Sequence, residues 1–235
     1  ALVVSYAVSR IMKIDHDIAT LVGVGSSICG GSAIAAAAPV IKASDEDIAQ
    51  SISVIFLFNV IAAFLFPTLG AILGFNDMGF GMWAGTAIND TSSVVAAGQT
   101  WASASGSDTA LNYATIVKLT RTLAIIPICL GLAYLTSKRK ATTSEVKISS
   151  IFPMFIIYFL GASIINTFAG SHFDFFQFLP AIGKFMIAMA MAAIGLNTNL
   201  VKLIKTGGKP ILLGLICWFC IAVVSLAMQH LLNIW

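Results

Sequence analysis

Two stretches of the sequence, residues 148–173 and 210–235, contain no Asp, Glu, Lys or Arg. Each is longer than the about 20 apolar residues that an α-helix needs to cross a hydrocarbon core of about 30 Å. Over the whole chain 10% of residues are charged and 58% are hydrophobic, whereas soluble domains carry about 25% charged residues. The sequence therefore predicts an all-α, polytopic transmembrane helical bundle that has the lipid bilayer as its first partner.

The remaining charges and the cysteines give little support to other classes of protein. A net charge of +3 is too small to indicate a nucleic-acid partner. The cysteines lie inside apolar runs, where Cys is usually a small buried hydrophobe, and the histidines fall near expected interfaces. We therefore expect neither a metal nor a cofactor. These residues are Cys29, Cys129, Cys217, Cys220, His16, His172 and His230.

Apolar segments of two kinds follow the short apolar start at residues 1–11. Five of them predict plain spans, at 48–74, 112–135, 148–170, 180–204 and 210–235. Two others carry polar or glycine-rich centres, namely 18–41 and 78–101. Gly weakens a helix by up to about 1 kcal/mol, so we expect both of these segments to be interrupted within the membrane. Because residues 1–11 are too short to span and have no basic leader, we expect one domain over 1–235 that lacks N-terminal helices, and no signal peptide.

Basic residues gather in three places, which the positive-inside rule assigns to the cytoplasmic side. They are Arg10 with Lys13, the loop 138–147, and Lys202 with Lys205 and Lys209. These groups share one side if every segment crosses, and equally if the two interrupted segments are re-entrant hairpins. Charge counting leaves both topologies open. A weak likeness between 27–38 and 88–98 is compatible with a duplicated element of an inverted repeat.

Polar residues at the two interruptions predict a binding site. A broken helix directs free N–H groups and a positive dipole end at its break, which attracts an anion. Glycines there let the backbone approach the ligand, hydroxyl groups replace its hydration, and two cations three residues apart supply positive charge. The candidate substrate-binding residues are Ser26, Ser27, Cys29, Gly30, Gly31, Ser32, Asn89, Asp90, Thr91, Ser92, Ser93, Lys118 and Arg121.

Simpler interpretations compete with this site. Lys118 and Arg121 fit a pair that extends toward a membrane interface. Asp90 fits a proton-exchanging or ion-coupling carboxylate, but equally a buried helix cap or a salt bridge with one of the cations. Residues 197–199 are either a third polar patch or a helix end. The methionines Met186, Met189 and Met191 are typical of packing.

Four segments carry a resemblance to a known family. They are 25–33, 83–98, 118–121 and 188–196. In their order and spacing the chain resembles the YeiH-type sulfate exporter family, which is grouped with the sodium/proton antiporter and bile-acid transporter superfamily. The resemblance implies a multi-pass protein of the bacterial cytoplasmic (inner) membrane, a homodimer, in which the interrupted segments cross the membrane as broken helices. It also implies more helices at the N-terminus than this chain holds.

These observations lead to one functional hypothesis and three alternatives. We expect a secondary transporter that exports a small oxyanion, such as sulfate, sulfite or a sulfonate, by alternating access, with proton or sodium coupling through Asp90. An alternative is a cation/proton antiporter in which Asp90 binds the ion. An intramembrane enzyme is less favoured because no nucleophile elbow or metal-binding His motif is present, so we expect no enzyme activity. A structural membrane subunit is the last alternative.

Overall fold

The computed structural model describes residues 1–139 and 208–234, with a few isolated positions between them. Every regular element in this part of the chain is an α-helix, as predicted. Most of the helices expected at 148–170 and 180–204 lies outside the described residues, as do His172, Met191 and the polar run 197–199. The basic residues Lys140, Lys147, Lys202 and Lys205 lie outside them too.

Three helical stretches of the described chain are long and apolar enough to cross a membrane. They are α4 (Asp45–Ile72), the stretch Thr109–Leu132 that runs from α7 (Thr109–Thr122) into α8 (Ile125–Arg139), and α13 (Gly208–Leu231). They match the plain spans predicted at 48–74, 112–135 and 210–235. At about 1.5 Å per residue, the 28 residues of α4 are enough for the hydrocarbon core.

A short turn at Leu123 and Ala124 separates α7 from α8. Pro127 has no N–H group to donate to the Leu123 carbonyl, which accounts for the interruption. The Leu123 carbonyl instead accepts from Ile126 N at 3.3 Å, and Ala124 N donates to Arg121 O at 3.1 Å, both in tighter turns. The turn therefore follows immediately after Arg121, one of the candidate site residues.

The remaining helices include a short first helix and two pairs of helices. The first helix is α1 (Leu2–Met12). We call α2 (His16–Ser27) with α3 (Gly31–Ile41) hairpin 1, and α5 (Asp77–Ala87) with α6 (Thr91–Ser105) hairpin 2. Residues 28–30 and 88–90 are the tips of the two hairpins, where the chain leaves the helical conformation.

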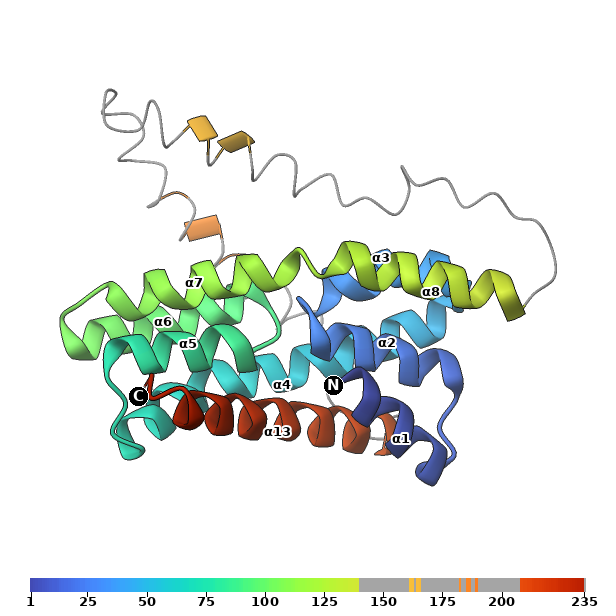
Figure 1. The fold of residues 1–235 in the computed structure, drawn as a ribbon, viewed down its shortest axis with the longest axis horizontal. Helices are drawn as coiled ribbons and strands as arrows, with labels where there is room; N and C mark the ends of the chain where they lie inside the picture. The colour runs from blue at the N-terminus through green and yellow to red at the C-terminus, as the bar shows by residue number, and fades with distance from the viewer. Residues whose placement is uncertain are drawn as a thin grey trace.

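Each second helix runs back along the first. In hairpin 2, Trp101 Nε1 near the end of α6 donates to Asp77 Oδ1 at the start of α5, at 2.8 Å. The Trp101 ring also stacks on Phe80, with centroids 4.2 Å apart. In hairpin 1, Ile34 Cδ1 lies 2.9 Å from the position of a Cβ added to Gly25. These contacts make hairpin 2 antiparallel, and Figure 1 shows the same arrangement for hairpin 1.

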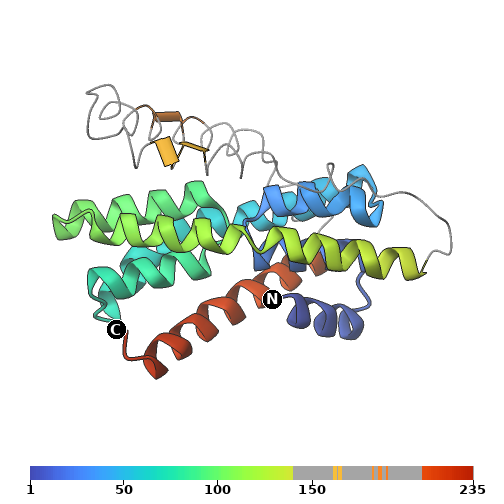
Figure 2. The ribbon, with the colours of Figure 1, turned by 45° about the horizontal axis from the view of Figure 1, so that its top comes forward.

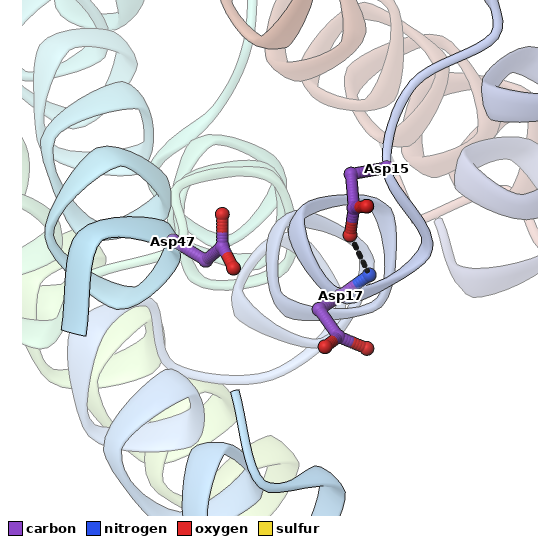
Figure 3. A group of neighbouring side chains, drawn as sticks. All are labelled: Asp15, Asp17 and Asp47. Carbon is purple, nitrogen blue, oxygen red and sulfur yellow. Dashed lines mark hydrogen bonds between the residues drawn. The ribbon is translucent and has the colours of Figure 1, made fainter. Parts of the chain in front are cut away.

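Carboxylates mark the common end of hairpin 1 and α4. The carboxylate oxygens of Asp15, Asp17 and Asp47 lie within 4.8 Å of one another (Figure 3). Asp15 caps α2, since its Oδ1 accepts from Asp17 N at 2.8 Å, and Ser44 caps α4 by accepting from Asp47 N at 3.2 Å. The acids therefore face the positive ends of two helices that start side by side. Because α3 ends just before α4 begins, hairpin 1 returns to the end at which it started.

Hairpin 2 enters from the opposite end of the molecule. The helix α4 leads from one end to the other, where α5 begins and α6 ends (Figures 1 and 2). The continuous line of α7 and α8 then returns along both hairpins (Figure 1). The two tips therefore meet near the middle, beside the turn between α7 and α8.

The crossing geometry that the resemblance favoured is therefore wrong for both interrupted segments. The prediction that the basic groups share one side is confirmed for the described members. We call this side the basic end, because α1, α3 and α8 end there and α13 begins there (Figure 1). These helix ends carry Arg10, Lys13, Lys42, Lys138, Arg139 and Lys209. Two re-entrant hairpins add no membrane crossing and two spans add two crossings, so the basic groups share one side in either case. The positions of the basic residues therefore cannot distinguish the two topologies.

Labelling of introduced cysteines tests this topology. In intact cells, cysteines at Lys13 and Ala43 should react alike with a membrane-impermeant maleimide, and those at Leu73 and Asp108 should react alike from the other side. Crossing segments would instead place the members of each pair on opposite sides, and that result would overturn the hairpin assignment. The unsubstituted protein is the control for background labelling, because Cys29, Cys129 and Cys217 are buried whereas Cys220 is partly exposed.

Close backbone contact holds hairpin 2 against α7. A Cβ added to Gly85 would lie 2.6 Å from Ala114 O and 2.9 Å from Val117 Cβ. Gly85→Ala should therefore lower the free energy of unfolding by about 1–3 kcal/mol, measured as a lower melting temperature in detergent. Gly131→Ala is the matched control, because a Cβ there meets nothing within 4 Å. Equal melting temperatures would contradict the contact.

Candidate functional site

The tips of the two hairpins meet beside the middle of α4. A Cβ added to Gly30, in the tip of hairpin 1, would lie 3.5 Å from Asn59 Nδ2 and 3.7 Å from Asp90 Cβ. Asn59 belongs to α4 and Asp90 to the tip of hairpin 2. Residues predicted from two separate segments thus lie together, and a side chain of a third helix joins them.

Lys118 of α7 connects the tips and is fully buried. Its Nζ donates to Ile28 O at 2.6 Å and to Ile88 O at 3.1 Å. Ile28 and Ile88 are the residues that directly follow α2 and α5. One ammonium group therefore satisfies the corresponding carbonyl of each hairpin.

Arg121 lies one turn further along the same face of α7. Its Nε donates to Ser27 O at 2.8 Å and its Nη2 to Ser26 O at 2.5 Å. On the side of hairpin 2, Nη1 donates to Thr86 O, and Nη2 also donates to Asn89 Oδ1 at 3.1 Å. The guanidinium group therefore contacts both hairpins.

These contacts give the cations a clear electrostatic role. The last carbonyls of a helix have no partner within it and form the negative end of its dipole. Inside a bilayer no water is available to satisfy them, and each unsatisfied group costs several kcal/mol. Lys118 and Arg121 supply the missing donors for α2 and α5. The alternative in which they extend toward a membrane interface is wrong, since their donors face buried backbone.

Asp90 closes the positive end of α6. Its Oδ2 accepts from Ser93 N at 3.2 Å and from the Ser92 hydroxyl group. Asn59 Oδ1 accepts from Asn89 N at 3.1 Å and from Asp90 N at 3.3 Å. The helix-cap interpretation of Asp90 is therefore confirmed.

The positive end of α3 has a different environment. Its N-cap is Gly30, with φ 71° and ψ −124°, and no side chain caps it. L-residues rarely adopt such a conformation, which explains the glycine. Around the two tips, three buried polar atoms have no hydrogen-bond partner within residues 1–139 and 208–234: Ser26 Oγ, Asn59 Nδ2 and Asn89 Nδ2. Buried polar groups are normally satisfied, so three such atoms together indicate a place for a ligand or water.

Other predicted site residues make local contacts. Ser27 Oγ donates to Gly23 O at 2.6 Å, within α2. Ser32 Oγ lies 2.9 Å from Cys29 Sγ, and Cys29 is 3% exposed. A Cβ on Gly31 would meet the Phe56 ring at 3.1 Å, so this glycine makes room for a neighbouring ring. Thr91 is the first residue of α6.

Asn59 is the site residue that the sequence interpretation missed. It is 1% exposed and lies in the middle of α4, in the apolar run 48–74 that predicted a plain span. An amide in the centre of such a run is an available signal, because polar groups at membrane depth are costly and need partners.

An apolar cavity of about 390 Å³ lies beside this site. It is lined by residues of α1, α5 and α13, among them Met82, Val224 and Met228. Thr86 lines it too; its Oγ contacts Ser225 Oγ at 2.5 Å, while its carbonyl accepts from Arg121. The cavity therefore touches the outer side of hairpin 2.

Fold and site together define a multi-pass α-helical integral membrane protein in which a buried lysine and a partly buried arginine lie between two helical hairpins. The chain belongs to the family described as Conserved hypothetical protein 698, whose model matches residues 1–214. It is 57% identical over 241 residues to a UPF0324 membrane protein of Streptococcus pyogenes serotype M3, covering all of this chain and 71% of that protein. A UPF0324 membrane protein of Fusobacterium nucleatum is 53% identical over 249 residues, with 100% and 72% covered. No solved structure matches the chain significantly.

Proposed function

We propose that the protein is a secondary transporter of a small oxyanion, with its binding site between the tips of hairpins 1 and 2. The observation that carries this proposal is the meeting of two hairpins, entering from opposite ends, at unpartnered polar atoms. Hairpins of this kind resemble the two halves of an inverted repeat, in which half-helix ends form the substrate site near the middle of the membrane. Alternating access would then arise when one hairpin or the other opens.

The charge of the site supports an anion as the substrate. Counted in their ionised forms, Lys118 and Arg121 contribute two positive charges and Asp90 one negative charge, which gives the tips a formal net charge of +1. The uncapped start of α3 and the amide N–H groups of Asn59 and Asn89 add hydrogen-bond donors and no negative charge. A cation/proton antiporter is less favoured, because Asp90 caps α6 and positive charge dominates its surroundings.

The remaining parts of the proposal rest on the sequence. The positive-inside rule places the basic end in the cytoplasm. Sulfate export, a homodimeric state, the absence of enzyme activity, and proton or sodium coupling through Asp90 stay predictions. Asp90→Asn tests the coupling: the same dependence of transport on the proton and sodium gradients as in the unsubstituted protein would reject it.

Asn59→Asp tests the site with little change of shape. The carboxylate keeps an oxygen for the N–H groups of Asn89 and Asp90, but it replaces the unpartnered Nδ2 donor and lowers the net charge of the tips to zero. We expect this variant to lose efflux of labelled sulfate or sulfite from proteoliposomes by at least about tenfold, equivalent to about 1.4 kcal/mol.

Ser103→Asp is the matched control, because it adds the same charge at an exposed position of α6. Both variants should elute as the unsubstituted protein does in size-exclusion chromatography. Unchanged efflux in Asn59→Asp would remove the tips from the transport path.

A further inference from the structure

The two hairpins correspond position by position at their tips. Ile28 and Ile88 each follow the first helix of a hairpin, and both carbonyls accept from Lys118 Nζ. Gly30 and Asp90 each follow two residues later, and each is the N-cap of the second helix. Lys118 thus bonds to the same position of each tip.

The two hairpins differ at the N-cap of their second helices. Asp90 provides a carboxylate at the start of α6, whereas Gly30 provides no side chain at the start of α3. Asp90 places its own negative charge at the positive end of α6. Gly30 leaves the positive end of α3 without a side-chain cap. Of these two similar anion-attracting ends, only that of α3 therefore lacks a side-chain cap, and we call it the open end.

A second observation also points to a ligand at this open end. Asn59 is 1% exposed, its Nδ2 has no partner in the described part of the chain, and this atom lies 3.5 Å from the Cβ position of Gly30. Asn89, also 1% exposed, holds a second unpartnered Nδ2. A buried donor without a partner costs about 1–3 kcal/mol, which an oxygen atom of a bound anion would recover.

Asp90 limits the charge that such an anion can carry. Its Cβ lies 3.7 Å from the Cβ position of Gly30, so its carboxylate is a neighbour of any ligand at the open end. One net positive charge at the tips matches one negative charge of a ligand, and a second negative charge would be buried without compensation. Burial of an uncompensated charge is strongly unfavourable in a low-dielectric interior.

We propose that the open end of α3, with the Asn59 and Asn89 amides, binds a singly charged oxyanion, and that Asp90 rejects doubly charged oxyanions of the same shape. This inference rests on the proposed function and narrows its substrate class. It assigns to Asp90 a role in specificity through like-charge repulsion. Among the expected substrates, it disfavours sulfate as the dianion.

Sulfate and perchlorate provide the test, because both are tetrahedral anions of four oxygens that differ by one unit of charge. Melting temperatures of the purified protein in a neutral detergent are followed against the concentration of each anion at constant ionic strength. The Asn59→Asp variant serves as the baseline for general salt effects. Preferential binding to the folded state raises the melting temperature. We expect perchlorate to act at a concentration at least tenfold lower than sulfate.

Asp90→Asn should reduce or invert this preference at least tenfold, because its amide oxygen still caps α6 while one negative charge is lost. If Asp90→Asn does not fold, Asp90→Ser is used in its place, because Ser is also a favourable N-cap residue for α6. Asp108→Asn, at the far end of α6 and α7, should leave the preference unchanged. A preference for sulfate, or one that Asp90→Asn does not alter, would overturn the inference and leave anion transport standing. No shift with either anion, nor with sulfite or a sulfonate, would instead count against the proposed function.

Discussion

Lys118→Met is expected to prevent accumulation of folded protein in the membrane. The methionine fills a similar volume but leaves the Ile28 and Ile88 carbonyls buried without a donor. Each such carbonyl costs about 1–3 kcal/mol, and two negative helix ends would then face each other without a cation. The measurement is the yield of monodisperse protein after solubilisation, together with the melting temperature of any that remains.

Thr120→Met is the matched control, because Thr120 is exposed on the same helix and bonds only within it, to Ile116 O and Val117 O. It should leave yield and melting temperature unchanged. If Lys118→Met gave the same yield and melting temperature as Thr120→Met, the bonds from Lys118 to the two tips would have no part in stability.

Arg121→Lys is expected to abolish transport although it keeps the positive charge. A guanidinium group offers five donors in a fixed fork, and here it contacts Ser26, Ser27, Thr86 and Asn89 at once. An ammonium group has three donors around one atom and cannot span these acceptors. Two lost charged hydrogen bonds at about 1.5–3 kcal/mol each should reduce efflux of a labelled oxyanion by at least about a hundredfold.

Arg10→Lys is the control for this change, because Arg10 is exposed near the basic end. The Arg121→Lys protein should also be compared by size-exclusion chromatography, so that loss of folding is separated from loss of transport. Efflux at the unsubstituted rate would show that charge alone, without the fork, is sufficient at this position.

Much of the fold was predictable, because a helix that crosses a bilayer needs an apolar segment of about 20 residues. The span at α4 follows from the run 48–74, and glycines and polar residues at 23–32 and 89–93 do interrupt the helices. The direction of the chain after each interruption was not predictable. It depends on contacts such as that between Trp101 and Asp77. These two residues are far apart in the sequence, and no sequence motif links them.

For the candidate site, the sequence indicated which residues lie together better than it indicated their contacts. The sequence indicated Lys118, Arg121, Gly30 and Asp90, because charged residues are costly at membrane depth and glycine weakens a helix. Their partners are main-chain carbonyls, which every residue possesses, so no residue type in the sequence marks them. Asn59 was missed because one amide barely alters the hydropathy of a long apolar run.

The distance along the chain between Lys118 and its acceptor Ile28, 90 residues, has a consequence for biogenesis. At synthesis rates of about 5–20 residues per second, α7 leaves the ribosome roughly 5–20 s after hairpin 1. During that interval the Ile28 carbonyl has no Lys118 to bond, so hairpin 1 cannot settle among lipid tails at full depth. Until then, hairpin 1 needs contact with water or with another protein to satisfy this carbonyl. Its full insertion into the membrane therefore depends on α7, which is synthesised later.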